Sequence, residues 1–318
     1  DVALDMYFDQ SDPRVDFDTL IQAIRTLGER VQVGTLIIIE TTVPPGTCEK
    51  VVLPTLREEL VKRKIHDNSV LVAHSYERIM PGDKYLESII NDWRAYSGDT
   101  LEAADACEDF LSKVINVAQY PLTRLGSIRA SETAKVMENT YRATNIAFIE
   151  EWTKYAETID IDLFEVIDTI RMRPTHSNIR VPGLGVGGYC LTKDPLFALI
   201  SANQLYGNEH LSFPFSCLAT EINSEMPVHS INRLTTLLGG VVGGKHILIC
   251  GVGYRQGVAD TRFSPSEHVV KTLEGRGATV ISYDPLIRYW SEMDRHLPNE
   301  LPDPKEFDAI VFAVPHQQ

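Results

Sequence analysis

Hydrophobic positions in this chain form short apolar runs that alternate with segments of helical spacing. DVALDM predicts a buried strand, an acidic stretch follows, and residues 17–31 have helical spacing. TLIIIETTVPPGT (35–47) predicts a strand that runs into a Pro-Pro-Gly turn, VVLPTLREELVKR a helix, and SVLVAHS (69–75) another strand. Because strands alternate with helices, we expect a parallel sheet with crossover connections. We further expect this to be the second half of a doubly wound domain whose first half lies outside the chain.

The middle of the chain is predicted to be helical. A long helix is expected from Ser131 to about Thr158, and another over residues 163–171. The Gly-rich segment PGLGVGG comes next, and a further helix is expected to start near Pro195. The first helix carries an apolar stripe at helical spacing, which we expect in the core or at a dimer seam; it consists of Met137, Tyr141, Phe148, Trp152 and Tyr155.

From Lys245 the alternation of strands and helices returns. HILICG, ATVISYDP and DAIVFAVP predict strands, and SEHVVKTLEGRG predicts a helix that ends in glycine. This pattern indicates a second Rossmann-like domain, which we expect to be cut short. The expected fold is α/β, with two Rossmann-like parallel-sheet domains joined by a long-helix central region and the N-terminal domain incomplete.

Composition narrows the class of protein. The chain has 318 residues, 43% of them hydrophobic, which is enough for two or three domains with cores. No apolar run approaches the ~20 residues of a membrane span. A net charge of −14 argues against nucleic acid as a partner. The five cysteines are odd in number and form no CxxC pair, so we expect neither a disulfide framework nor a metal site. The same cysteine usage leads us to expect a cytoplasmic location.

The segment GLGVGGYCLTKDP (183–195) holds the strongest candidate site. Its glycines would let the backbone approach a ligand closely. Asp194 and Pro195 are a good N-cap and N1 pair, so a helix is predicted to start there. Cys190 would then lie just before a positive helix end and near Lys193, two features that favour the nucleophilic thiolate. The alternative is a buried structural cysteine, with Asp194 only capping the helix.

Lys135 and Asn139 form a second candidate pair on the long helix. Their spacing of four residues places them on one face, together with Glu132 and Arg142. An ammonium group beside a carboxamide could stabilise a developing oxyanion. For this pair alone, however, the pattern favours a solvated helix face.

Two weaker signals follow predicted strands. ETTVPPGT places Thr42 at the carboxyl end of a strand, where ligands bind in open α/β sheets. HSYERIMPG places Glu77 in a similar position, where it could hold or activate water. Alone, each signal is weak, because Pro-Pro-Gly turns are common and Glu77 beside Arg78 is more often a surface ion pair.

GVGYRQG (251–257) also follows a predicted strand. Its GxGxxxG spacing is one residue longer than the dinucleotide fingerprint. Asp284, which ends the next strand, lies 33 residues after Gly251, where about 20 is usual. We interpret this segment as part of a nucleotide-shaped fold used for something other than NAD, with Arg255 and Arg262 suited to phosphate recognition.

Taken together, the segments TTVPPGT, YERIMPG, SETAKVMENT, GLGVGGYCLTKD and GVGYRQGVADTRFSP resemble the UDP-glucose/GDP-mannose dehydrogenase family, in order and over nearly the whole chain. The resemblance implies a partial NAD-binding domain at 1–125, a central helical dimerisation region with the cysteine loop at 126–226, and a truncated C-terminal nucleotide-sugar-binding domain at 227–318. It implies a homodimer or higher homo-oligomer that oxidises a UDP-sugar, with polysaccharide precursor synthesis as its setting.

The reaction implied is a four-electron oxidation of the sugar's C6 alcohol to the uronic acid with two NAD. Cys190 adds to the intermediate aldehyde as a thiohemiacetal, a second hydride transfer leaves a thioester, and water hydrolyses it. By position, Lys135 and Asn139 match the residues that stabilise the oxyanion, Asp194 the carboxylate that helps to activate water, and Thr42 and Glu77 the residues that assist water and proton movement. The resemblance further suggests cofactor contacts from Thr42, Pro44 and Lys193, and substrate contacts from Tyr76, Glu77, Arg78, Gly187, Gly188, Arg255 and Arg262.

The sequence also departs from the family pattern. The family's first strand and its GxGxxG loop are not in this chain. HSYERIMPG is closer to the PERxxPG form of the UDP-N-acetylhexosamine branch than to the NPEFLREG of UDP-glucose enzymes. Enzymes of that branch have a histidine directly before the cysteine, and this chain has Tyr189 there. They also have an arginine a little upstream, and in this chain His176 lies near that position. The LTKD run instead resembles the glucose branch, and Arg255 replaces the family's lysine.

Two other functions remain open from the sequence. A β-hydroxyacid dehydrogenase shares the general plan and a Lys-xxx-Asn helix, but performs a single hydride transfer and needs no thiol. A non-catalytic module that binds a nucleotide sugar would also account for the chain.

Overall fold

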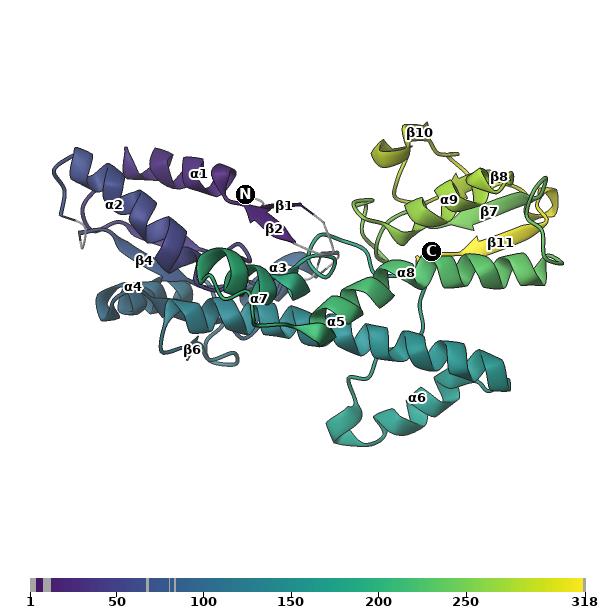
Figure 1. Ribbon diagram of the computed structural model, residues 1–318, viewed down its shortest axis with the longest axis horizontal. Helices are drawn as coiled ribbons and strands as arrows, with labels where there is room; N and C mark the ends of the chain where they lie inside the picture. The colour runs from purple at the N-terminus through teal and green to yellow at the C-terminus, as the bar shows by residue number, and fades with distance from the viewer. Residues whose placement is uncertain (1–3, 8–12, 67–68, 80, 83, 317–318) are drawn as a thin grey trace. The chain divides into compact units, whose positions relative to one another are not determined.

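The computed structural model describes residues 4–7, 13–66, 69–79, 81–82 and 84–316, which divide into two compact units (Figure 1). The first unit comprises Asp1–Thr140 and Lys193–Cys217, and the second comprises Tyr141–Thr192 and Leu218–Gln318. Each unit has its own sheet and its own hydrophobic core. The expected α/β architecture with a helical middle is therefore confirmed.

The sheet of the first unit has four strands in sequence order: β3 (Leu36–Ile39), β4 (Leu71–His74), β5 (Ala95–Gly98) and β6 (Thr123–Arg124). β3 and β4 are parallel, with Leu36 opposite Leu71, and β5 and β6 are parallel too. β5 runs antiparallel to β4, so the expectation of an all-parallel sheet is wrong at this pair. Among the described residues only the short helix α3 (Tyr85–Ile90) separates these two strands, and a parallel pair needs a longer crossover.

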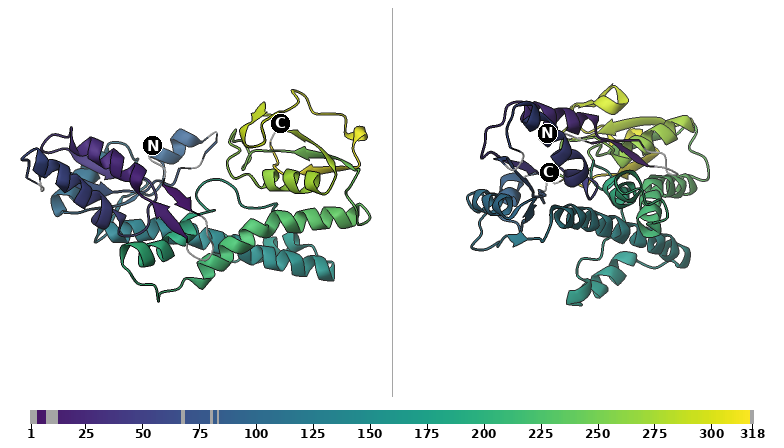
Figure 2. Two further views of the ribbon diagram at one scale, coloured as in Figure 1. Left: turned by 45° about the horizontal axis from the view of Figure 1, so that its top comes forward. Right: turned by 60° about the vertical axis from the view of Figure 1, so that its left-hand side comes forward.

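Helices α1 (Asp18–Gly28) and α2 (Leu53–Lys62) lie side by side beside this sheet, as Figures 1 and 2 show. Their close approach depends on Gly28, because a Cβ there would lie 2.6 Å from the Cβ of Glu59. The π-helical turn η1 (Cys48–Val52) leads into α2. α4 (Leu101–Ser112), capped by Thr100, packs on β5, and neither of these two elements was identified in the sequence.

The predicted opening strand is β1 (Asp5–Tyr7), which pairs antiparallel with β2 (Arg14–Asp16) as a separate two-stranded ribbon. The strand was expected from residue 1, and residues 1–3 lie outside the described part of the chain. β1 is therefore not a strand of the four-stranded sheet β3-β4-β5-β6.

The Pro-Pro-Gly turn after β3 depends on its glycine. Gly46 has φ +96°, a conformation that side chains disfavour, and a Cβ there would lie 2.4 Å from the hydroxyl oxygen of Tyr206. We expect Gly46→Ala to lower the free energy of unfolding by about 1–3 kcal/mol, measured by urea denaturation. Gly34→Ala is the control for φ alone, since its φ is +82° and no atom lies within 4 Å of its Cβ position. Equal losses in the two variants would contradict a role for the contact with Tyr206.

The second unit contains the predicted second Rossmann-like sheet. Its three strands are parallel in the order β11-β7-β8. Ser264 caps the helix that packs beside β8, and Pro265 occupies its first turn. The bounds are β7 (His246–Cys250), α9 (Pro265–Gly275), β8 (Thr279–Tyr283), β11 (Ala309–Phe312) and the small antiparallel pair β9 (Tyr289–Trp290) and β10 (Arg295–His296).

The remaining α-helices of the described residues are α5 (Ile128–Ile159), α6 (Leu163–Arg171), α7 (Phe197–Ile200) and α8 (Pro214–Leu237), and the short helical segments include η3 (Pro174–His176), η5 (Ser201–Leu205), η6 (Ser291–Met293) and η7 (Pro304–Glu306). α6 packs on the C-terminal part of α5 through a small core that includes Ile149 and Ile167. The predicted apolar stripe of α5 is exposed, which contradicts the first of its two expected placements, the core: the exposed fractions are Met137 69%, Tyr141 55%, Phe148 48%, Trp152 46% and Tyr155 53%. No described helix has the length and hydropathy of a membrane-spanning segment.

Candidate active site

The N-terminal half of α5 carries a buried polar face. Only 6% of Lys135 and 2% of Asn139 is exposed, and Glu132 is buried on the same face. The sequence pattern favoured a solvated helix face for Lys135 and Asn139 as a pair, and that interpretation is wrong. Polar side chains buried in this way must find partners, and those partners define the candidate site.

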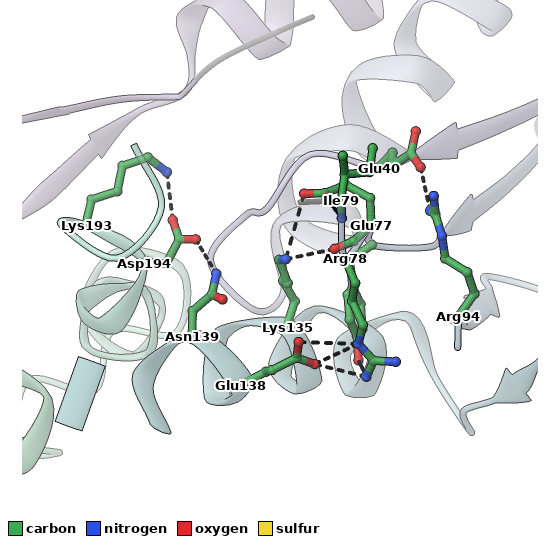
Figure 3. Close-up of polar contacts among 11 residues, drawn as sticks. Glu40, Glu77, Arg78, Ile79, Arg94, Lys135, Glu138, Asn139, Lys193 and Asp194 are labelled. Atoms are coloured by element: carbon green, nitrogen blue, oxygen red, sulfur yellow. Dashed lines mark hydrogen bonds and ion pairs between the residues drawn. The ribbon is translucent and has the colours of Figure 1, made fainter. Parts of the chain in front are cut away.

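The carboxylate of Asp194 accepts hydrogen bonds from Asn139 of α5 and from the neighbouring Lys193. Asn139 donates from Nδ2 to Asp194 Oδ2 at 2.7 Å, and Lys193 donates from Nζ to Asp194 Oδ1 at 2.8 Å (Figure 3). Asp194 is fully buried, and Lys193 lies over the ring of Phe197 at 4.3 Å. Asn139, Asp194 and Lys193 therefore form a continuous buried chain of charge-assisted hydrogen bonds.

Asp194 was expected to cap a helix, and the structure corrects this. The short 3-10 helix η4 (Asp194–Leu196) begins at Asp194, and the capping position belongs to Lys193, which makes no side-chain cap. Burial raises the pKa of Asp194, and the charges and hydrogen bonds of Lys193, Asn139 and Lys135 partly oppose that rise. A carboxylate with a raised pKa is a stronger base than an exposed one, as activation of water requires.

Lys135 connects α5 to the segment after β4. Its Nζ donates to the carbonyl oxygen of Glu77 at 2.8 Å and lies 3.8 Å from the Glu77 carboxylate (Figure 3). The Glu77 carboxylate also accepts a hydrogen bond from the amide of Ile79. Lys135, Asn139, Asp194, Lys193 and Glu77 all belong to the first unit.

Arg78 has a different partner from the one that the sequence suggested. It pairs with Glu138 of α5 rather than with Glu77, at 2.9 Å between Nη2 and Oε2. It also donates to the carbonyl of Trp93 at 2.6 Å and to the Tyr76 hydroxyl at 3.1 Å. Sequence reasoning missed Glu138, although it lies three residues after Lys135, next to it on the helix surface.

Two of the three expected cofactor contacts, Thr42 and Pro44, follow β3, and the third, Lys193, is paired with Asp194. Thr42 is half-buried and Pro44 is buried. Thr42 follows the last residue of β3 by three positions, at the carboxyl-end edge of the sheet where ligands bind in open α/β folds. No glycine-rich phosphate-binding turn occurs in residues 1–47 of the sequence. At this edge Glu40 pairs with the buried Arg94 at 2.5 Å.

Two further buried groups on α5 and β4 were missed. Glu132 accepts hydrogen bonds from the backbone amides of Gly46 and Cys48, and Ser131 bonds to the ring of His74 at 2.7 Å. Glu132 was noted only as a neighbour of Lys135, and its pairing with a loop 86 residues away has no signal in the helix periodicity.

The ionisation of Glu132 and His74 is predicted to have opposite effects on stability. Burial raises the pKa of Glu132 from 4.5 to about 7 and lowers the pKa of His74 from 6.5 to about 4. The contribution of Glu132 is therefore full below pH 4.5 and is lost as the pH rises to 7. The contribution of His74 is full above pH 6.5 and is lost as the pH falls to 4.

We therefore expect Glu132→Gln to expose the dependence on His74. Relative to the unchanged protein, the variant's free energy of unfolding should rise by on the order of 3 kcal/mol between pH 4.5 and 7. Urea denaturation across this range measures it. If the two proteins give parallel stability curves, Glu132 does not titrate in this window.

Cys190 is exposed and belongs to the second unit, so the alternative of a buried structural cysteine is wrong. The glycines before it pack on the loop after β7. A Cβ at Gly187 would lie 2.8 Å from the Cβ of Tyr254, and a Cβ at Gly188 would lie 3.0 Å from the Tyr254 ring. The Gly188 amide also donates to the carbonyl of Arg262 at 3.2 Å. These glycines permit a close approach of the thiol segment to that loop.

The loop after β7 is organised by a buried carboxylate. Asp284 accepts from the amides of Val252 at 2.8 Å and Gly253 at 3.1 Å, and its Oδ2 lies 3.2 Å from the ring nitrogen of His316. Of the expected phosphate-binding arginines, Arg262 is exposed and pairs with Asp260 at 2.7 Å. Arg255 is exposed on the same loop.

Comparison with known proteins matches three consecutive parts of the chain to one family. Residues 8–109 match the NAD binding domain, 129–225 the central domain, and 248–318 the UDP binding domain of the UDP-glucose/GDP-mannose dehydrogenase family. The chain belongs to this family. The predicted resemblance is thereby confirmed, and the match to the NAD binding domain identifies NAD as the cofactor.

Two proteins similar to this chain are named UDP-N-acetyl-D-mannosamine dehydrogenase. The one from Methanocaldococcus jannaschii is 32% identical over 86% of this chain and 58% of its own length, and the one from Pyrococcus horikoshii is 32% identical over 95% and 68%. A solved structure of UDP-D-ManNAc dehydrogenase from Pyrococcus horikoshii superposes with a TM-score of 0.82 at 29% identity, covering 98% of this chain and 69% of the other. The chain thus spans little more than half the length of the Methanocaldococcus relative.

Proposed function

We propose that this protein oxidises the C6 alcohol of a UDP-N-acetylhexosamine to the uronic acid, with NAD as hydride acceptor and Cys190 as covalent nucleophile. UDP-N-acetyl-D-mannosamine is the first substrate to test, because similar family members carry that name. The observation that carries the proposal is the buried group of Lys135, Asn139 and Asp194, with an exposed thiol four residues before Asp194 in the sequence.

The thiol explains how one protein could carry an alcohol through to an acid. When bound, NAD supplies the hydride acceptor for each of the two oxidation steps. The Cys190 thiolate adds to the carbonyl carbon of the intermediate aldehyde, and the carbonyl oxygen takes up a proton to give a thiohemiacetal. Loss of the C6 hydride and of the hydroxyl proton then leaves a thioester. Addition of water to the thioester releases the acid and restores the thiol. A β-hydroxyacid dehydrogenase needs no such thiol, and membership of the nucleotide-sugar family favours the covalent route.

Lys135 and Asn139 supply the donors for the oxyanion. Each addition to the carbonyl carbon places negative charge on its oxygen, and preorganised donors in a water-poor environment stabilise that charge strongly. Both side chains are buried and held by hydrogen bonds to Glu77 and Asp194. The cost of ordering them is therefore met during folding rather than during the reaction.

Asp194 is the proposed base for thioester hydrolysis. Its raised pKa suits removal of a proton from water, and Asn139 and Lys193 fix the orientation of both its oxygens. Glu77, 3.8 Å from Lys135, and Thr42 at the end of β3 are assigned to proton and water movement. Lys193 is engaged with Asp194, so we assign it to orienting the base.

The substrate's diphosphate is assigned to Arg255 and Arg262 of the second unit, because guanidinium groups bind phosphate oxygens in pairs. Gly187 and Gly188 allow the backbone to approach the sugar. Arg78 is held by Glu138 and the Trp93 carbonyl, so we assign it and Tyr76 to shaping the segment around Glu77.

A homodimer is proposed through the exposed stripe of α5. Phe148, Trp152 and Tyr155 form successive ring contacts, with centroids 6.1 and 5.7 Å apart, and each is about half exposed. Large aromatic clusters of this kind are typical of protein interfaces. A monomeric mass for the full-length protein in sedimentation would contradict this assignment.

The function is tested by supplying UDP-sugars one at a time to the full-length protein with NAD. The expected result is NADH and the sugar acid in a ratio of two to one, with a UDP-N-acetylhexosamine preferred. A ratio of one to one, with an aldehyde or ketone product, would overturn the covalent mechanism. Tight UDP binding without any turnover would favour the non-catalytic binding module.

A further inference from the structure

The Pro-Pro-Gly turn between β3 and η1 is held from several sides. Within the turn, the Thr47 hydroxyl donates to the carbonyl of Pro44 at 2.6 Å. From the helix after Asp194, the Ser201 hydroxyl donates to the carbonyl of Pro45 at 2.5 Å, and Tyr206 packs against Gly46. The turn therefore lies between the strand that ends near Thr42 and the helical segment that begins with Asp194.

The fourth contact is a buried carboxylate from α5. Glu132 Oε2 accepts from the amide of Gly46 at 2.5 Å, and Oε1 accepts from the amide of Cys48 at 2.8 Å. Glu132 is 1% exposed and Cys48 is fully buried. Each carboxylate oxygen thus satisfies one buried backbone donor of the turn, and no other side chain type of this length offers two acceptor oxygens.

Glu132 lies on the same face of α5 as the proposed oxyanion donors. It precedes Lys135 by three residues and Asn139 by seven, which are spacings of one helix face. One residue before it, Ser131 bonds to His74 at the end of β4. α5 is therefore tied at adjacent positions to the segments that follow β3 and β4.

We propose that Glu132 is a positioning residue for the oxidation, because it fixes the turn after Thr42 against the helix face that carries Lys135 and Asn139. The inference rests on the proposed function for its catalytic consequence. Its structural part, the attachment of the turn to α5, stands on the hydrogen bonds of Gly46 and Cys48 alone.

Replacing Glu132 with glutamine tests the geometry with little change of volume. Glutamine keeps one acceptor oxygen, but its amide group is a donor and would face the donor N–H of either Gly46 or Cys48. We expect faster hydrogen exchange at these two amides. We also expect a KM for NAD about tenfold higher and a kcat about tenfold lower, with the KM for the UDP-sugar unchanged.

Glu150→Gln is the matched control. Glu150 lies on the same helix and is 2% exposed, but its charged partner is Lys154, 3.6 Å away, and it belongs to the second unit. The control should leave the exchange of the Gly46 and Cys48 amides and both KM values unchanged.

The measurements separate this inference from the proposed function. Faster amide exchange in Glu132→Gln together with the NAD-specific change in KM supports the inference. The inference is overturned if Glu132→Gln shows unchanged amide exchange, or a lower melting temperature with unchanged kinetics. It is also overturned if Glu150→Gln shows the same kinetic change. If the unchanged protein oxidises no UDP-sugar, the proposed function fails. The role of Glu132 is then tested by measuring NAD affinity with titration calorimetry. Weaker NAD binding in Glu132→Gln supports the inference, and equal binding overturns it.

Discussion

Replacing Cys190 with serine is expected to lower the rate of sugar-acid formation by at least about 10³-fold. A serine hydroxyl is far less ionised than a thiol at neutral pH, and the ester that it could form is hydrolysed less readily than a thioester. UDP-sugar affinity should change little, because the substrate contacts proposed for Arg255 and Arg262 remain. Product analysis by mass spectrometry, with NADH measured in parallel, gives the result.

Cys217→Ser is the control for thiol chemistry in general. Cys217 is partly exposed, packs at the edge of the first unit's core and has no place in the proposed site. It should retain the activity of the unchanged protein. Sugar-acid formation that survives unchanged in Cys190→Ser would rule out the covalent route and return the β-hydroxyacid type of mechanism to consideration.

Asp194→Asn is expected to lower kcat by about 10²–10⁴-fold, because the base that activates water is lost while the thiol remains. The thioester should then accumulate on Cys190, and intact-protein mass spectrometry after mixing with UDP-sugar and NAD would detect it. The same change leaves the buried Lys193 ammonium without its counter-charge, which we expect to cost about 2–4 kcal/mol of stability.

A second variant separates the two effects. Lys193→Met together with Asp194→Asn removes the unpaired charge, so it should recover part of the stability and none of the turnover. A recovery of turnover along with stability would mean that Asp194 acts only in folding. Absence of a covalent adduct in Asp194→Asn, despite slow turnover, would place the loss before the thioester rather than at its hydrolysis.

The alternation of strands and helices, and the positions of most of these elements, could be predicted from the sequence. α6 lies over the residues expected of it, and β7, β8 and β11 lie within their predicted segments, because hydrophobic period and glycine punctuation are local signals. The direction of a strand depends on its pairing partner and not on local sequence, so neither the existence of β5 nor its direction was predicted. β5 pairs antiparallel with β4, and the connection between these two strands contains little helix.

The candidate site shows the same limit. Cys190 and Asp194 were found because motif chemistry is written in consecutive residues. The burial of Lys135 and Asn139 was not, since helix periodicity assigns a polar face to solvent unless a distant chain segment covers it. Glu132, Glu138 and His74 were missed because their partners lie 57 or more residues away in the sequence.

Asp284 has a consequence for how the second unit can hold a nucleotide. In many strand–loop–helix turns the first loop amides are open to an anion, and a phosphate group settles there. In this protein the amides of Val252 and Gly253 already face an internal carboxylate that is fully shielded from water. An incoming diphosphate would meet negative charge at that turn, so its recognition must rely on cationic side chains farther along the loop, and binding should weaken steeply as salt concentration rises.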